Sequence, residues 1–139
     1  MTATVDSTSV NRDDLVRVAV ATVLGVLGIY VAVVAADALL HGSVSRPGDA
    51  VLVPLLGLHA LVVGIWCGLR DMSENSTVVV STSYVVALVA LMPVAEFVEP
   101  VGALTDPNLP LLAVLFVMVL GVVQGLSYVG YRVGGALAD

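Results

Sequence analysis

The chain has 139 residues, of which 59% are apolar and only 12% are charged, and it carries a net charge of -6 and a mean hydropathy of +1.07. Soluble domains usually contain roughly 25% charged and 45 to 50% apolar residues, so this composition supplies too little polar surface to face water. One cysteine and five basic residues exclude a disulfide scaffold and a nucleic-acid binder, and the apolar content excludes a disordered chain. The composition therefore predicts an integral membrane protein whose first partner is the lipid bilayer.

The charged residues have an unusual balance of types. All five basic residues are arginines, and eleven carboxylates lower the calculated pI to about 4.5. This acid excess, with arginine in place of lysine, resembles the composition of proteins from extreme halophiles, and the resemblance identifies no family. It implies loops that face molar salt, where a Debye length of roughly 3 Å leaves surface ion pairs little to contribute.

The first apolar run covers residues 18–36 and predicts a membrane-spanning helix over about 14–41, because about 20 residues cross the hydrocarbon core. Residues 1–13 are expected to form a frayed tail, and residues 14–139 a single domain. A secretory signal peptide is the alternative for this run. Its length exceeds the usual apolar region of a signal peptide, and acidic residues precede it, so a retained helix is expected.

Three further runs without acidic or basic residues cover 50–69, 75–95 and 107–131 and predict helices over about 50–70, 77–99 and 109–133. A membrane β-barrel would need short segments of alternating polarity, and residues 51–56 and 112–120 do not alternate. The short polar connections are rich in turn-forming residues. The sequence thus predicts an all-α membrane protein with four transmembrane helices in an up-down-up-down antiparallel bundle.

The arginines predict the orientation of this bundle. A cytoplasmic N-terminus places Arg12, Arg17, Arg70 and Arg132 inside and only Arg46 outside, whereas the opposite orientation reverses this ratio. Membrane insertion favours arginine on the cytoplasmic side. Both termini are therefore expected in the cytoplasm, with the chain as a multi-pass protein of the cell membrane.

Small residues recur at helical spacings and predict close helix packing, because helices in lipid associate through backbone proximity. In chain order they are Ala21, Gly25, Gly28, Ala32, Gly57, Gly64, Gly68, Gly121 and Gly125, and Gly130 and Gly134 repeat the last spacing. Packing within the bundle is the favoured interpretation of these stripes. The alternative is that at least one stripe is a dimer face.

Four ionisable residues are expected near the outer membrane surface. Asp37 and His41 lie four residues apart, and Glu96 and Glu99 lie three apart, so each pair shares one helix face. Together they form a candidate site for a divalent cation or for proton entry, with the metal unspecified. The simpler interpretation, which is favoured, is that these charges mark the end of the hydrocarbon core.

His59 is the one ionisable side chain expected near the membrane midplane, roughly 14 Å below the start of its helix at 1.5 Å per residue. A hydrogen bond to a backbone carbonyl, Tyr30 or Tyr84 is the favoured role, ahead of a proton relay. Haem ligation is the least supported role, because His41 lies too near the surface to pair with His59. No cofactor is expected.

No motif in the chain specifies a reaction, so an enzyme is not expected and no residue is assigned a catalytic role. The favoured hypothesis is a non-enzymatic subunit or accessory protein that packs with itself, as a homo-oligomer, or in a larger membrane complex. The alternative is a proton- or cation-linked transporter or channel that uses the outer acidic residues and the midplane histidine.

Overall fold

Four long helices make up nearly all of the computed structural model, which describes residues 12–42, 49–98 and 108–139. They are α1 (Arg12–His41), α2 (Asp49–Leu69), α3 (Asn75–Val98) and α4 (Leu109–Ala138). All four are long and apolar enough to cross a membrane, which confirms the predicted helical membrane fold. The predicted bounds agree within two residues except at the end of α4, which continues five residues beyond the predicted 133.

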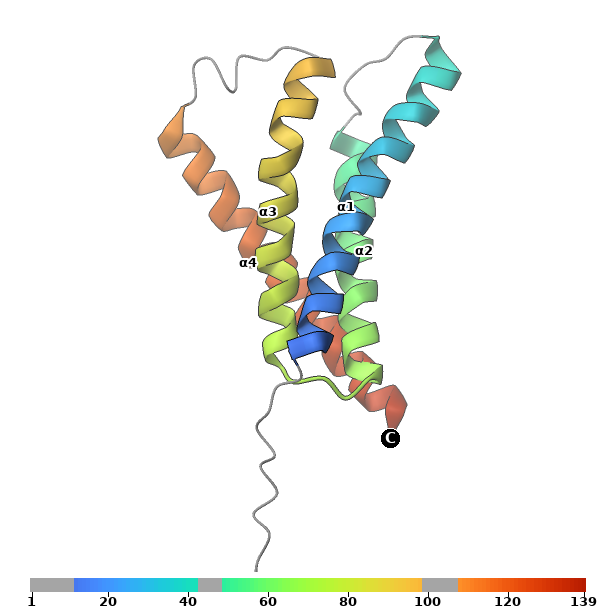
Figure 1. Ribbon diagram of the computed structural model, residues 1–139, viewed down its shortest axis with the longest axis vertical. Coiled ribbons are helices and arrows are strands. Elements are labelled where there is room, and N and C mark those ends of the chain that lie inside the picture. The colour runs from blue at the N-terminus through green and yellow to red at the C-terminus, as the bar shows by residue number, and fades with distance from the viewer. Residues whose placement is uncertain (1–11, 43–48, 99–107) are drawn as a thin grey trace, which may run out of the picture.

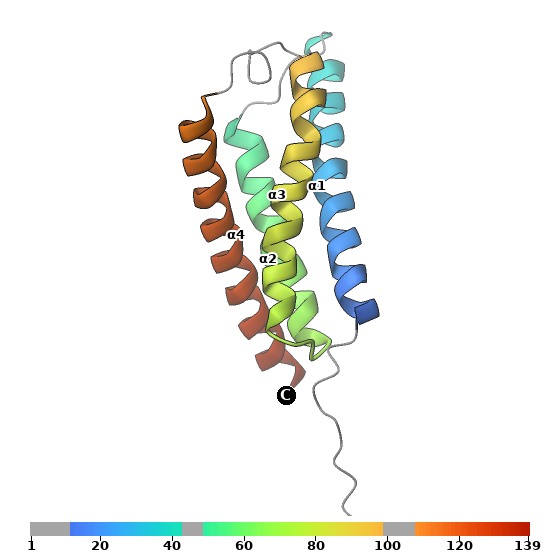
Figure 2. The same ribbon diagram turned by 60° about the vertical axis from the view of Figure 1, so that its left-hand side comes forward.

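The helices lie side by side along the long axis of the molecule (Figures 1 and 2). The ends of α2 and α4 and the beginnings of α1 and α3 meet at the lower end of Figure 1. Within the described residues, α2 contacts α4 most extensively, α1 contacts α3 and α2, and α1 does not contact α4. Figure 1 also shows the N-terminal half of α4 diverging from α3.

The ends of the helices are closed by local hydrogen bonds. Asn108 caps α4 by accepting a hydrogen bond from the Leu111 amide at 3.2 Å. At the end of α2, the Met72 amide donates to the Cys67 carbonyl at 3.1 Å, and Asp71 has a positive φ of 50°. These caps satisfy terminal backbone groups that helical bonding leaves unpaired.

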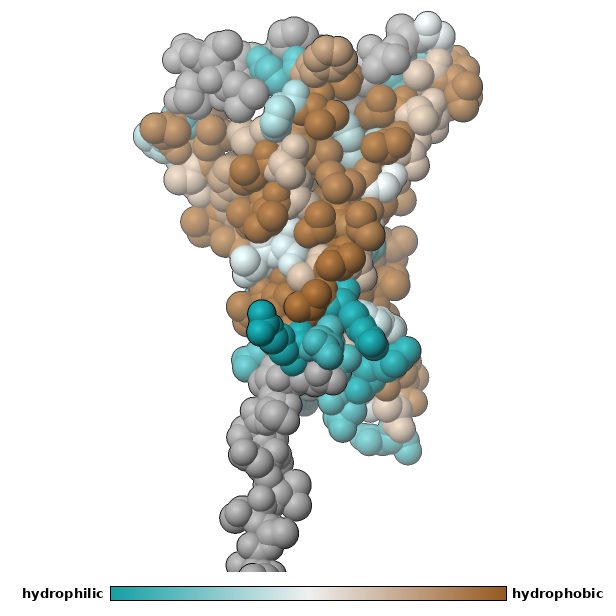
Figure 3. Space-filling view, viewed as in Figure 1, coloured by the Kyte–Doolittle hydropathy of each residue, from teal (hydrophilic) through white to brown (hydrophobic). Residues whose placement is uncertain are grey.

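Most apolar side chains point outward rather than into a core. The most apolar stretch of α4 is almost entirely unburied, and a small central cluster contains Val26, Ala60, Tyr84 and Ala87. Hydrophilic residues gather at the lower end where α1 begins, and hydrophobic residues cover the surface above them (Figure 3). This distribution fits a helix bundle surrounded by hydrocarbon above a polar boundary.

Candidate functional site

The three described residues of the predicted cation site, Asp37, His41 and Glu96, do not form a group that could hold a metal ion. His41 Nδ1 lies 2.8 Å from an Asp37 carboxylate oxygen, so the two residues pair along the same face of α1. Glu96 lines a cavity that is formed chiefly by α3 and α4, with further side chains from α1 and α2. Glu99 lies outside the described residues.

The structure therefore gives no support to a shared cation site. Within residues 12–42, 49–98 and 108–139, no three His, Cys, Asp or Glu side chains lie close enough to hold a metal ion. The convergence of all four residues stays a prediction, because Glu99 is one of them. The Asp37 and His41 side chains contact each other, one helical turn apart on α1. The Glu96 side chain instead lines the cavity.

His59 joins α2 to α3 through a short chain of hydrogen bonds. Its Nδ1 atom lies 2.5 Å from the Tyr84 hydroxyl, and that hydroxyl donates to the Leu56 carbonyl at 2.8 Å. Because a hydroxyl has one proton, both bonds form together only when His59 Nδ1–H is the donor to Tyr84. The chain ends on a carbonyl, which cannot pass a proton onward, so this geometry favours the structural role over a relay.

The other edge of the His59 ring packs against α1. A Cβ added at Gly25 would overlap the imidazole, with Nε2 as its nearest atom. Gly25 thus provides the space that lets the ring lie between α1 and α3 while it bonds to Tyr84. One residue of the predicted α1 stripe therefore has a specific steric role.

The remaining small residues divide into three groups. Added Cβ atoms at Gly64, Gly68, Gly130 and Gly134 would overlap the backbone of the facing helix, so these residues form the crossing of α2 and α4. Gly57 meets only the Leu126 side chain, at ordinary contact distance. The expected contact within the bundle is not observed for the other small residues. Gly28, Gly121 and Gly125 have nothing within 4 Å of an added Cβ among the described residues. Ala21 and Ala32 are exposed.

The physical reason for this difference is the position of each helix. Only one turn of α1 faces the His59 ring, and the outer half of α4 diverges from its neighbours (Figure 1). A regular spacing of small residues predicts a smooth face but does not say whether that face meets protein or lipid.

A polar clamp that was not predicted from the sequence joins α3 to α4 in the lower half of the molecule. Ser81 Oγ donates to Gln124 Oε1 at 2.8 Å, and Gln124 Nε2 donates to Thr77 Oγ1 at 2.9 Å. Thr77 and Ser81 lie four residues apart, on one helix face. That spacing and a glutamine inside an apolar span signal that polar groups on both helices need partners, but they do not say that these groups pair with each other.

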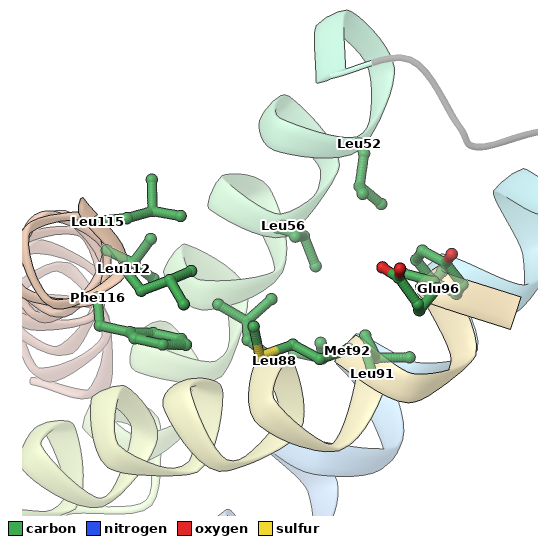
Figure 4. Close-up of a pocket in the computed structure, with 13 residues that line it drawn as sticks. Leu52, Leu56, Leu88, Leu91, Met92, Glu96, Leu112, Leu115 and Phe116 are labelled. Atoms are coloured by element: carbon green, nitrogen blue, oxygen red, sulfur yellow. The ribbon is translucent and has the colours of Figure 1, made fainter. Parts of the chain in front are cut away.

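An apolar cavity of about 290 Å³ lies in the upper half of the molecule. Figure 4 shows leucine side chains from α2, α3 and α4 and the Phe116 ring around it, with the Glu96 carboxylate at one side. Tyr30 of α1 also lines the cavity. Its lining is thus mainly hydrocarbon, with few polar groups.

These contacts hold helices together at two levels, through the clamp and through the His59–Tyr84 bond, and leave a cavity above them. Comparison with protein-family models, with curated proteins and with solved structures finds no match to this chain.

Proposed function

We propose that this chain is a non-enzymatic membrane subunit that packs, through the face of α4 that contains Gly121 and Gly125, with a second copy of itself or with another membrane protein. The observation that carries the proposal is the outward position of Gly121 and Gly125, which have nothing within 4 Å of an added Cβ among the described residues. The two glycines lie four residues apart, so they create a smooth face on which another helix backbone can approach closely.

The same helix provides an internal precedent for this mode of packing. Gly130 and Gly134 have the same spacing, and their backbone lies directly against Ile65 and its neighbours in α2. In lipid, such contacts contribute through van der Waals packing, because apolar side chains gain little by leaving hydrocarbon. The outer pair has the same chemistry and lacks a facing helix within the described chain, which supports an intermolecular contact there.

A site-directed crosslinking experiment tests the contact. In a Cys67→Ala background, a benzophenone maleimide is attached to Gly121→Cys and, as the matched control, to Leu58→Cys, which lies on the exposed face of α2. On irradiation in native membranes, we expect a discrete protein adduct from position 121 and only lipid adducts from position 58. Equal protein adducts from both positions, or none from position 121, would contradict the proposal.

We also propose that the four helices cross the cell membrane up-down-up-down with both termini in the cytoplasm. Arg12, Arg17, Arg70 and Arg132 lie on the segments that meet at the lower end of Figure 1, which supports this orientation under the arginine bias of insertion. The Arg70 guanidinium also lies 5.9 Å from the centroid of the Trp66 ring, a pairing suited to a membrane interface.

Labelling from outside the cell checks the orientation. In the Cys67→Ala background, a membrane-impermeant maleimide is expected to label His41→Cys in intact cells and to label Ser73→Cys only after the membrane is opened. Both positions are exposed, so accessibility within the protein does not separate them. The reverse labelling pattern would refute a cytoplasmic N-terminus.

A further inference from the structure

The upper cavity offers almost nothing to a polar ligand. Eleven of its thirteen lining residues are apolar. Tyr30 is one exception, but its hydroxyl has less than 1 Å² of accessible surface, so that oxygen is closed to an occupant. Glu96, the other exception, lies at one side (Figure 4) and already interacts with another group. The lining therefore suits hydrocarbon and selects no polar head group.

The cavity lies at the depth of the acyl chains in one leaflet of a bilayer. Its residues on α3 lie within 88–96, further up the helix than Tyr84, whose bond to His59 lies near the expected midplane. The outward side chains of α4 beside it are apolar, and Leu115 and Met118 are 53% and 63% exposed. Bilayer hydrocarbon, and not water, is therefore the medium next to the cavity.

The way in which α4 is held explains why the cavity exists. In the lower half of the molecule, Gln124 bonds to Ser81 and Thr77 and holds α4 against α3. Above this clamp the two helices diverge (Figure 1), and most of the residues that line the cavity come from their diverging parts. The cavity is therefore a consequence of the angle between α3 and α4, and it borders the surface where they separate.

Water and empty space are both poor occupants of this cavity. A buried water needs about two to four polar partners, and the accessible polar lining is limited to one carboxylate at the side. If the cavity of about 290 Å³ were empty, the side chains around it would lose van der Waals contacts on one side. A hydrocarbon chain from the adjacent bilayer supplies those contacts and requires no hydrogen bond.

We propose that one acyl chain of a bilayer phospholipid enters between α3 and α4 and fills this cavity. Its volume of about 290 Å³ lies near the lower end of small-molecule pockets, which run from roughly 300 to 1,000 Å³, so it takes part of one chain and not a whole phospholipid. The lipid is held by its chain, and its head group stays at the membrane surface. This inference does not depend on the intermolecular contact through α4.

Methionine methyl groups provide the test. Met92 lines the cavity (Figure 4), Met118 is exposed on α4, and Met72 lies in the connection between α2 and α3. The full-length chain, deuterated except for its methionine methyl groups, is studied by NMR in phosphatidylcholine nanodiscs. We expect nuclear Overhauser contacts from acyl methylene protons to Met92 and Met118 and none to Met72. A contact from water in place of the acyl signal at Met92, or no acyl contact there, would overturn the proposal.

Two variants and a matched control assign the contact to the cavity. Leu112→Trp fills the cavity and should abolish the acyl contact of Met92 while that of Met118 remains, and Ala95→Leu, a smaller change on α3, should weaken it. Leu111→Trp makes the same change one residue away, at an exposed position that does not line the cavity, and should leave both contacts intact. An acyl contact of Met92 that persists in both cavity variants would place the chain outside the cavity and refute the proposal.

Discussion

Gly64→Ala and Gly130→Ala should each lower the free energy of unfolding in lipid by about 1 to 3 kcal/mol, the usual cost of adding atoms to a packed contact. An added methyl at Gly64 would overlap the Ser127 backbone, and one at Gly130 would overlap the Leu61 carbonyl. Backbone atoms cannot move aside as a side-chain end can, so the two helices must separate. Helix propensity favours alanine by up to about 1 kcal/mol, which offsets only part of this loss.

The matched control for this prediction is Gly28→Ala on α1. Gly28 lies in a helix and has nothing within 4 Å of an added Cβ among the described residues, so the change carries the propensity gain without the overlap. Unfolding in bicelles, followed by steric trapping, gives the three free energies under the same conditions. If Gly130→Ala proves as stable as Gly28→Ala, then α2 and α4 do not cross in backbone contact at these glycines.

Tyr84→Phe is expected to lower the free energy of unfolding by about 1 to 2 kcal/mol, the upper part of the range for interhelical hydrogen bonds in membranes. The change removes the acceptor of His59 Nδ1–H and the bond to the Leu56 carbonyl in one step. The buried imidazole N–H then has no partner at that position, and the ring loses the contact that orients it toward Gly25.

Tyr30→Phe is the natural comparison, because the Tyr30 hydroxyl is buried without a hydrogen bond among the described residues. In bilayers of synthetic phosphatidylcholine, this variant should be as stable as the parent chain or slightly more stable, because the change removes no hydrogen bond among the described residues. Both free energies follow from the same bicelle unfolding assay. A Tyr84→Phe variant that unfolds no more easily than Tyr30→Phe would remove the assigned role of the His59–Tyr84 bond.

The sequence was a sufficient guide to the helices, because membrane insertion depends on length and polarity, which are properties of single segments. The runs 18–36, 50–69, 75–95 and 107–131 each lie inside an observed helix except for the start of the last. The predicted end of α4, at residue 133, lies before the observed end at Ala138. Arg132 ends the uncharged run at that point, yet the helix continues to Ala138, and the Gly134 backbone packs against α2 within this last part.

Which helices pack against each other was much harder to predict from the sequence than where the helices lie. In soluble bundles an apolar stripe identifies the inner face, but here apolar residues cover every face and lipid offers them an equivalent environment. The small residues of α1 around Gly28 therefore have the same spacing as a true packing face. Of the two glycines among them, Gly25 and Gly28, only Gly25 lies close to a neighbouring helix among the described residues. The partner of Gln124 likewise depends on how α3 and α4 are rotated, which no local pattern specifies.

His59 was an intermediate case. Its depth limited its partners to the few polar groups near the midplane, and Tyr84 was one of the three predicted choices. Selecting among them required the helix arrangement, because Tyr30 on α1 lies instead against the upper cavity.

Extraction of membranes with alkaline sodium carbonate tests the central claim, that the apolar helices of this chain are embedded in the bilayer, most directly. Carbonate at high pH opens vesicles and releases proteins held by charge or by surface adsorption, whereas a bundle of apolar helices remains embedded in hydrocarbon. We expect all of the protein to sediment with the washed membranes and to enter solution only with detergent. Release into the carbonate supernatant, as a dispersed protein without detergent, would contradict the account.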